Sequence, residues 1–121
     1  MIVFHHTNSR DVGKLFENKA EAYLKSKDYV ILDKNFHCRY GEIDLIAISP
    51  DQTIVFVEVK SRHSCSYGSA VEAVTAHKCE KIRKTSRFYI YQKKLGWNRK
   101  YRYDVIVFQN EHMNHIMNAF Y

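Results

Sequence analysis

The sequence predicts an α/β domain in which helices flank a mixed central sheet. Two stretches with helical periodicity, 11–26 and 75–94, lie on either side of three short β-rich stretches. A fourth β-rich stretch, 101–108, follows the second helix, which gives the order αβββαβ. The 121 residues, of which 45% are hydrophobic and 26% charged, fit one globular domain over 1–121, with a flexible stretch expected at 1–10.

The first helix is predicted over 11–26, because its apolar residues recur every three or four positions and so share one face. These residues are Val12, Phe16, Ala20 and Tyr23. Ser9 or Asp11 is expected to cap the start of the helix.

Three strands are predicted over 29–36, 42–49 and 53–62. Ser-Pro-Asp-Gln at 49–52 is typical of a tight turn, so the second and third strands should form a hairpin. Residues 54–57 are apolar at every position, which indicates a strand covered on both faces. The third strand is therefore expected at the centre of the sheet.

The second helix is predicted over 75–94, preceded by a capping box at Ser69–Glu72 and ended by Gly96. Its inner face is expected to carry Cys79, Ile82, Ser86, Tyr89 and Ile90. A helical crossover returns the next strand, 101–108, in parallel, and 112–120 is expected to add an edge strand.

The charge balance points to an anionic partner. Lys and Arg number 19 against 13 Asp and Glu, a net charge of +6, and small basic domains commonly bind nucleic acid. No apolar run approaches the ~18 residues that cross a bilayer. Met1–Asp11 also lacks the pattern of a signal peptide. We therefore expect a cytoplasmic protein that binds nucleic acid and no membrane.

The three cysteines, Cys38, Cys65 and Cys79, each lie close to a histidine, so a zinc site is conceivable. None of the pairs has the usual spacing of zinc ligands. Free thiols in a reducing compartment are the favoured interpretation.

Charged residues in two adjacent predicted strands form the main candidate site. Asp44 interrupts one apolar strand, and Glu58 and Lys60 leave the same face of the next. Because hairpin pairing brings the two carboxylates together, they should repel one another, and a divalent cation relieves that repulsion. Oxygen ligands suit Mg²⁺ or Mn²⁺. Lys60 would orient a water molecule or neutralise charge developing on a phosphate.

Glu17 lies beside the apolar face of the first helix, from which it would reach the same cluster as a third carboxylate. The alternative is a structural salt-bridge network of Asp44, Glu58 and Lys60, with Glu17 exposed to solvent on the flank of its helix.

The spacing of these residues resembles the PD-(D/E)xK nuclease motif, since thirteen residues separate Asp44 from Glu58-Val59-Lys60. Longer strings are similar to the YraN family of small bacterial proteins. They are Gly41–Ala47 (GEIDLIA), Val55–Arg62 (VFVEVKSR), Ala73-Val74 followed by Lys78, Arg102–Ile106 (RYDVI), the helix with Gly13, Glu17, Ala20, Tyr23 and Leu24, and the tail His115–Phe120. One departure is Phe16, where the family often has glycine.

The resemblance implies a restriction-endonuclease-like fold, shared with Holliday-junction resolvases and tRNA-endonuclease-like proteins. It implies a catalytic set of Glu17, Asp44, Glu58 and Lys60. Metal ligation would come from Asp44, Glu58 and the Val59 carbonyl. By analogy with the resolvases, a homodimer is expected.

Contacts to nucleic acid are expected from basic side chains and exposed rings. The basic candidates are Arg39, Arg62, His63, Lys78, Arg83, Lys84 and Arg87. The aromatic candidates are Tyr40, Tyr67, Trp97 and Tyr101, of which Trp97 is favoured for stacking.

The leading hypothesis is a Mg²⁺-dependent nuclease that hydrolyses phosphodiester bonds in nucleic acid, with DNA, including branched DNA, as the expected partner. The alternative is a non-cleaving nucleic-acid-binding protein of the same fold that acts in DNA repair or recombination. A structural protein–protein module is a third class, which the basic charge disfavours.

Overall fold

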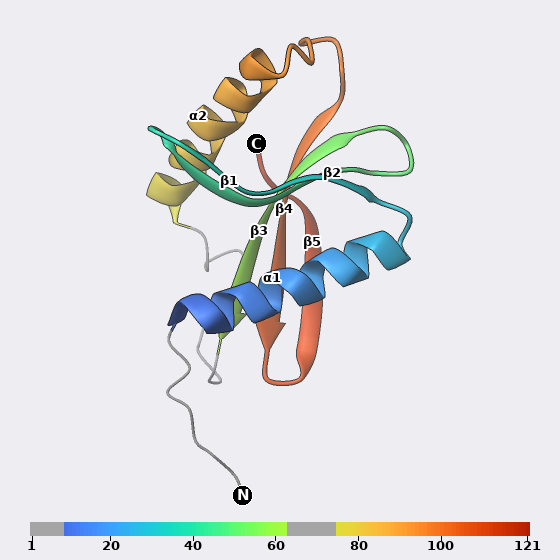
Figure 1. The fold of residues 1–121 in the computed structure, drawn as a ribbon, viewed down its shortest axis with the longest axis vertical. Coiled ribbons are helices and arrows are strands. Elements are labelled where there is room, and N and C mark those ends of the chain that lie inside the picture. The colour runs from blue at the N-terminus through green and yellow to red at the C-terminus, as the bar shows by residue number, and fades with distance from the viewer. Residues whose placement is uncertain (1–8, 63–74) are drawn as a thin grey trace, which may run out of the picture.

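The computed structural model describes residues 9–62 and 75–121. Along the chain these form α1 (Ser9–Ser26), β1 (Val30–Cys38), β2 (Gly41–Ile48), β3 (Ile54–Arg62), α2 (Ala76–Gln92), β4 (Tyr101–Gln109) and β5 (His112–Phe120) (Figure 1). The expected αβββαβ order and the expected edge strand are both confirmed. The capping box at Ser69–Glu72 lies outside the described residues. So does most of the stretch expected to be flexible, although Ser9 and Arg10 already belong to α1.

The sheet is mixed and places β3 at its centre, as predicted. Its strand order is β1-β2-β3-β4-β5, and only β3 and β4 run parallel. The parallel pair is the one joined through α2, because a strand can return in the same direction only by crossing over the sheet. Within the described ranges, neither helix is long and apolar enough to cross a membrane.

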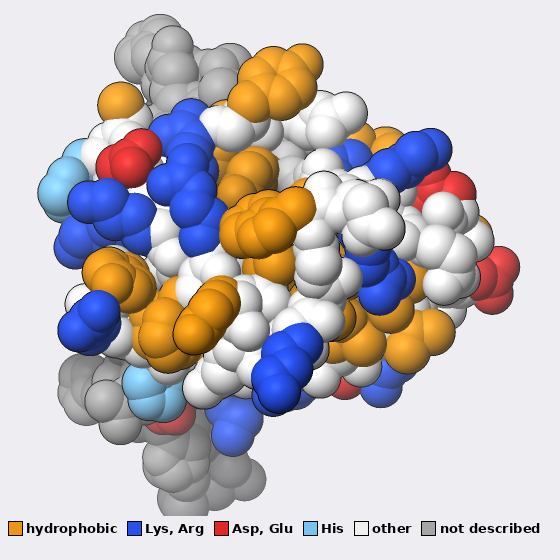
Figure 2. Space-filling view, turned by 90° about the horizontal axis from the view of Figure 1, so that it is seen from above, with side chains coloured by type: hydrophobic (Ala, Val, Ile, Leu, Met, Phe, Trp, Pro, Cys, Tyr) orange, Lys and Arg blue, Asp and Glu red, His pale blue; other side chains and the backbone are white. Residues whose placement is uncertain are grey.

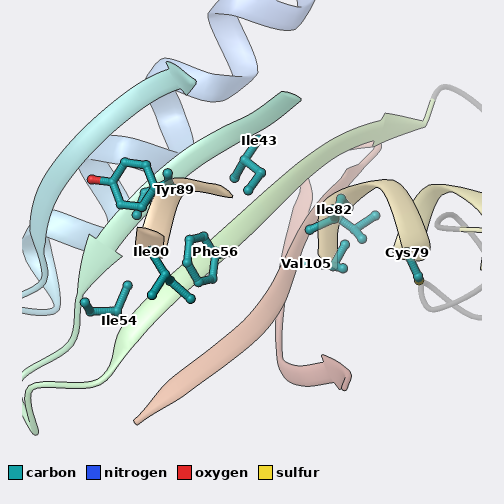
Figure 3. Packing of buried hydrophobic residues seen from close by; sticks show 10 residues of the cluster. Ile43, Ile54, Phe56, Cys79, Ile82, Tyr89, Ile90 and Val105 are labelled. Carbon is teal, nitrogen blue, oxygen red and sulfur yellow. The ribbon is translucent and has the colours of Figure 1, made fainter. Parts of the chain in front are cut away.

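Two hydrophobic clusters lie on opposite faces of the sheet, because β3 alternates its side chains between them. Ile54 and Phe56 pack with Tyr89 and Ile90 of α2 (Figure 3). Val55 and Val57 pack with Ala20 and Leu24 of α1, and every one of these eight side chains is at most 3% exposed. The helices therefore cover the two faces, and the inner stripe predicted for the second helix is confirmed.

The second helix is shorter than predicted. It begins after Thr75, whose side chain accepts a hydrogen bond from the Lys78 N–H, and it ends at Gln92. Lys94 already adopts a left-handed conformation with φ of 55°, before the chain reaches Gly96 with φ of 84°. The expectation that Gly96 ends the helix was wrong, because a non-glycine residue takes the first left-handed position.

Candidate active site

The two predicted carboxylates meet where β2 separates from β3. The strands pair from Leu45↔Val57 to Ile48↔Ile54, and one further step in that register sets Asp44 opposite Glu58. Ile43 and Ile46 both belong to the cluster under α2, whereas a regular strand would direct them to opposite faces. The backbone alternation is thus broken at Asp44, and β2 leaves β3 there.

A backbone hydrogen bond fixes the Asp44 side chain in this position. The N–H of Val59 donates to Asp44 Oδ2 over 2.7 Å. Glu58 is only 5% exposed. The hairpin that sequence reasoning expected therefore brings the two acids together, and it places Lys60 two positions further along the same face of β3.

Two lysines lie against Glu58, and sequence reasoning had placed only one of them here. Lys78 Nζ, from the first turns of α2, is 2.8 Å from Glu58 Oε1. Lys60 Nζ is 3.9 Å from the same oxygen. Lys78 was predicted as a nucleic-acid contact, and the structure places its amino group within the acidic cluster. The sequence signals for Lys78 were the family-like string Ala73-Val74 followed by Lys78 and its position near a predicted helix start. Neither signal gives the contact with β3, because that contact depends on how α2 packs.

The pKa values of the two acids are raised, in the first place because both are buried. Burial raises the pKa of Glu58 to about 7, and the charge of Asp44 adds to that rise. Burial also raises the pKa of Asp44, although the Val59 N–H and Lys78 oppose it. The pKa of Lys60 is lowered, first by burial and then by Lys78. A cation bound directly by the two carboxylates would relieve the repulsion between them.

Glu17 approaches the cluster from α1 and is half-buried. Its pKa is raised by burial first and by the charge of Asp44 second, while a hydrogen bond with the side chain of Asn35 opposes the rise. Sequence reasoning did not single out Asn35, which lies in β1 with a left-handed φ of 52°. A non-glycine residue at positive φ leaves no clear mark in a single sequence.

Asp44 and Glu58 are the side chains of the cluster that could ligate a divalent ion. Among residues 9–62 and 75–121, no group of three or more His, Cys, Asp or Glu side chains is gathered in a metal-binding arrangement. This leaves Asp44 and Glu58 as the paired carboxylates, with raised pKa values that a cation would relieve. Mg²⁺ is usually held by one or two carboxylates together with waters and substrate phosphates, so this set fits Mg²⁺.

The other predicted contact residues are spread over several places. Arg39, Lys84 and Arg87 are exposed beside one cavity. Arg83 instead pairs with Glu80 at 3.2 Å and donates to the backbone carbonyl of Tyr121. Arg62 ends β3, while His63, Tyr67 and Cys65 lie outside the described residues. Cys38 is a free thiol, as expected, and Cys79 is buried in the cluster under α2.

A second buried polar cluster was not predicted. Asp104 of β4 is fully buried and accepts hydrogen bonds from Arg102 (2.9 Å), from His115 (2.7 Å) and from the Asn118 N–H (3.1 Å). Burial alone would raise the pKa of Asp104, but His115 and Arg102 outweigh it and hold that pKa below its usual value. His115 in turn contacts the Tyr23 hydroxyl of α1 at 3.1 Å, so the cluster ties β4, β5 and α1 together.

Replacing Asp104 by alanine is expected to lower the free energy of unfolding by about 3–5 kcal/mol, since it leaves Arg102 and His115 buried without their partner. Urea unfolding of the variant measures this loss. Glu111→Ala, in the exposed turn between β4 and β5, is the matched control and should change stability by less than about 0.5 kcal/mol. A loss below about 1 kcal/mol for Asp104→Ala would contradict the structural role.

Stability should also depend on the protonation of Glu58. Its folded-state pKa is raised from 4.5 to about 7, so between these values the folded state binds more protons than the unfolded state. The free energy of unfolding of the metal-free protein should therefore fall as pH rises from 4.5 to 7, by about 2–3 kcal/mol. Glu58→Gln should flatten this dependence. An equally steep pH profile in that variant would assign the effect to another group.

Comparisons with known proteins place the chain in a family. The model of "Uncharacterised protein family UPF0102" matches residues 16–108, which include Glu17, Asp44, Glu58, Lys60 and Lys78. This chain belongs to the UPF0102 family. UPF0102 is the YraN family that the sequence strings resemble.

Bacterial UPF0102 proteins are similar to it over most of their length. The UPF0102 protein of Sulfurihydrogenibium sp. (strain YO3AOP1) is 44% identical over 108 residues, covering 89% of this chain and 92% of that protein. The one from Caldanaerobacter subterraneus subsp. tengcongensis is 46% identical over 120 residues, with 93% and 97% covered. The one from Clostridium botulinum (strain Kyoto / Type A2) is 46% identical over 101 residues, with 84% and 81% covered.

Proposed function

We propose that this UPF0102 protein is a Mg²⁺-dependent nuclease of the PD-(D/E)xK type, with a restriction-endonuclease-like fold, that hydrolyses phosphodiester bonds in nucleic acid. The observation that carries the proposal is the meeting of Asp44 and Glu58 at the point where β2 leaves β3, with the Lys60 amino group 3.9 Å from Glu58. Two acids with raised pKa values beside a lysine are costly for stability, and such costs are common at functional sites.

Each residue has a distinct part in this proposal. Asp44, Glu58 and the Val59 carbonyl would hold Mg²⁺, which supplies positive charge for the phosphate oxygens. Lys60, whose pKa is lowered by burial and by Lys78, would orient the attacking water or stabilise the charge that develops on phosphorus-bound oxygens. Glu17 would accept a hydrogen bond from that water or support a second ion.

Lys78 would share the phosphate with Lys60. Its pKa is raised because contacts with Glu58 and Lys60 outweigh the effect of burial, so it stays positively charged at neutral pH. When the acids bind a cation, the Lys78 amino group loses its main attraction to Glu58 and becomes available to an incoming anion. Cationic side chains are therefore distributed along α2, from Lys78 at the acidic cluster to the exposed Lys84 and Arg87.

The test is a cleavage screen with labelled branched, single-stranded and duplex substrates, in Mg²⁺, Mn²⁺ or a chelator. Metal-dependent products are expected from at least one substrate, and Asp44→Ala should abolish them because it removes one of the two paired carboxylates. Cleavage that persists at the wild-type rate in Asp44→Ala would place the activity elsewhere.

A non-cleaving nucleic-acid-binding protein is the second candidate, and the Lys78–Glu58 contact favours it. At 2.8 Å this ion pair already neutralises the carboxylate that would bind the metal. Under this candidate the protein binds nucleic acid, but Mg²⁺ does not stabilise it even when nucleic acid is bound. That outcome, with no product from any substrate in the screen, would replace the nuclease proposal.

A further inference from the structure

A cavity of about 490 Å³ lies between the turn joining β1 to β2 and the outer face of α2. It is lined by three cationic and three aromatic side chains, namely Arg39, Tyr40, Lys84, Arg87, Phe88 and Tyr91. Its volume is within the ~300–1,000 Å³ range of small-molecule sites. None of these residues belongs to the acidic cluster.

Aromatic rings line part of the cavity, and two of them lie against each other. The ring centroids of Tyr40 and Phe88 are 6.1 Å apart with an interplanar angle of 59°. Tyr91 is 81% exposed, an unusual position for a tyrosine that packs against no core. Flat apolar rings exposed beside a hollow can stack on the face of a planar ligand.

The charged part of the lining is entirely cationic. The Arg39 guanidinium donates to the Tyr40 hydroxyl at 2.7 Å and lies 4.9 Å from the centre of the Tyr40 ring, so it is held in place above that ring. Lys84 and Arg87 project from α2 one turn apart and are exposed. Figure 2 shows the same intermixing of Lys and Arg with hydrophobic side chains on the face of the molecule that it views.

A second cavity, of about 420 Å³, lies against the start of β2 and an earlier part of α2. Its lining includes Gly41, Glu42, Lys81 and Lys78, and Lys78 contacts Glu58 of the acidic cluster. The turn can approach the helix closely because residue 41 is glycine: an added Cβ would lie 3.1 Å from Thr85 Oγ1. From Lys78 to Arg87 the helix rises about 14 Å. One short single strand can therefore contact both residues.

We propose that the cavity lined by Arg39, Tyr40, Lys84, Arg87, Phe88 and Tyr91 binds an unpaired nucleotide of a single-stranded nucleic acid. The base stacks on the rings, and the phosphates on either side contact Arg39, Lys84 and Arg87. A base inside a duplex is already stacked on both faces, so the site selects single strands, flaps or unpaired ends over blunt duplex. The inference rests on the proposed function for its nucleic-acid partner and adds the form of the substrate.

The experiment measures binding in a chelator, where cleavage cannot occur. Fluorescence anisotropy with a short labelled oligothymidylate gives the affinity of the wild type and of Tyr91→Ala, Phe88→Leu and Arg87→Ala. Tyr121→Ala and Lys27→Ala are matched controls, because Tyr121 carries an exposed ring and Lys27 is an exposed cation just after α1, and neither residue lines the cavity. Tyr91→Ala removes an 81% exposed side chain, so it should fold normally.

We expect Tyr91→Ala to weaken oligothymidylate binding about tenfold, because a stacked base is lost. Arg87→Ala should weaken it too, and should also reduce the slope of log affinity against log salt by about one phosphate contact. Tyr91→Ala should leave that slope unchanged. Both controls should bind like the wild type, and blunt duplex should bind more weakly than the single strand.

Three results would overturn the inference. The first is an affinity for Tyr91→Ala and Phe88→Leu within about twofold of the wild type. The second is equal binding of polyphosphate, which has no bases, and the third is equal binding of polyglutamate, which would indicate an acidic protein partner. Base-dependent binding without any cleavage in Mg²⁺ supports the inference and removes the nuclease proposal, so the two can fail separately.

Discussion

Replacing Lys60 by alanine is expected to slow phosphodiester cleavage by about a hundredfold or more while leaving the response to Mg²⁺ intact. The amino group of Lys60 is 3.9 Å from Glu58 Oε1, further than that of Lys78, and it is half-buried on the face of β3 that carries Glu58. Under the nuclease proposal it would act on water or phosphate and not on the ion.

Single-turnover cleavage measures the expected loss of rate. Thermal unfolding of the same sample with added Mg²⁺ measures whether the response to the ion is intact. Lys27→Ala removes an exposed lysine outside the site and should match the wild type in both. If Lys60→Ala cleaves as fast as the wild type, Lys60 has no part in the chemistry. If it cleaves slowly because it no longer responds to Mg²⁺, its role is to position the carboxylates.

The double variant Asp44→Asn, Glu58→Gln is expected to lose the stabilisation by Mg²⁺ completely. A ligand that binds only the folded state adds about 2.7 kcal/mol when its concentration is a hundred times its dissociation constant. The wild type should show this gain once a nucleic acid is bound, because Mg²⁺ commonly needs substrate phosphates to complete its ligand set. The amide side chains keep the shape of the site and remove both negative charges.

Thermal unfolding across a Mg²⁺ titration, with and without a bound oligonucleotide, checks this prediction. Glu111→Gln is the matched control, because it removes one exposed carboxylate in the turn between β4 and β5. A full Mg²⁺ response in the double variant would show that the ion binds elsewhere on the protein.

Most of the fold could be predicted because its signals are local. The helical stripe from Cys79 to Ile90 and the apolar run 54–57 each determine one element and the face or faces it buries. The meeting of Asp44 and Glu58 was also predictable, since a short turn at 49–52 fixes the hairpin register. The end of α2, with Lys93 as its C-terminal cap, could not be predicted. Where a helix ends depends on the backbone dihedral angles of one or two residues, here those of Lys93 and Lys94.

The parts of the site that were missed depend on packing between distant elements. Lys78 reaches Glu58 only because α2 crosses the sheet at that point, since Lys78 lies twenty positions after Glu58 in the sequence. Asp104 did carry a usable signal: like Asp44, it is an acid inside an apolar strand. Its partners Arg102 and His115 show that the same signal can mark a satisfied structural network.

The most direct test of the nuclease proposal is single-turnover cleavage of the substrate that binds best, by the wild type and by the Asp44→Asn, Glu58→Gln variant, each in Mg²⁺ and in a chelator. The account predicts product only from the wild type with Mg²⁺, while both proteins remain folded and bind the substrate. Product formed equally by the variant, or no product from a wild type that binds both substrate and Mg²⁺, would contradict it.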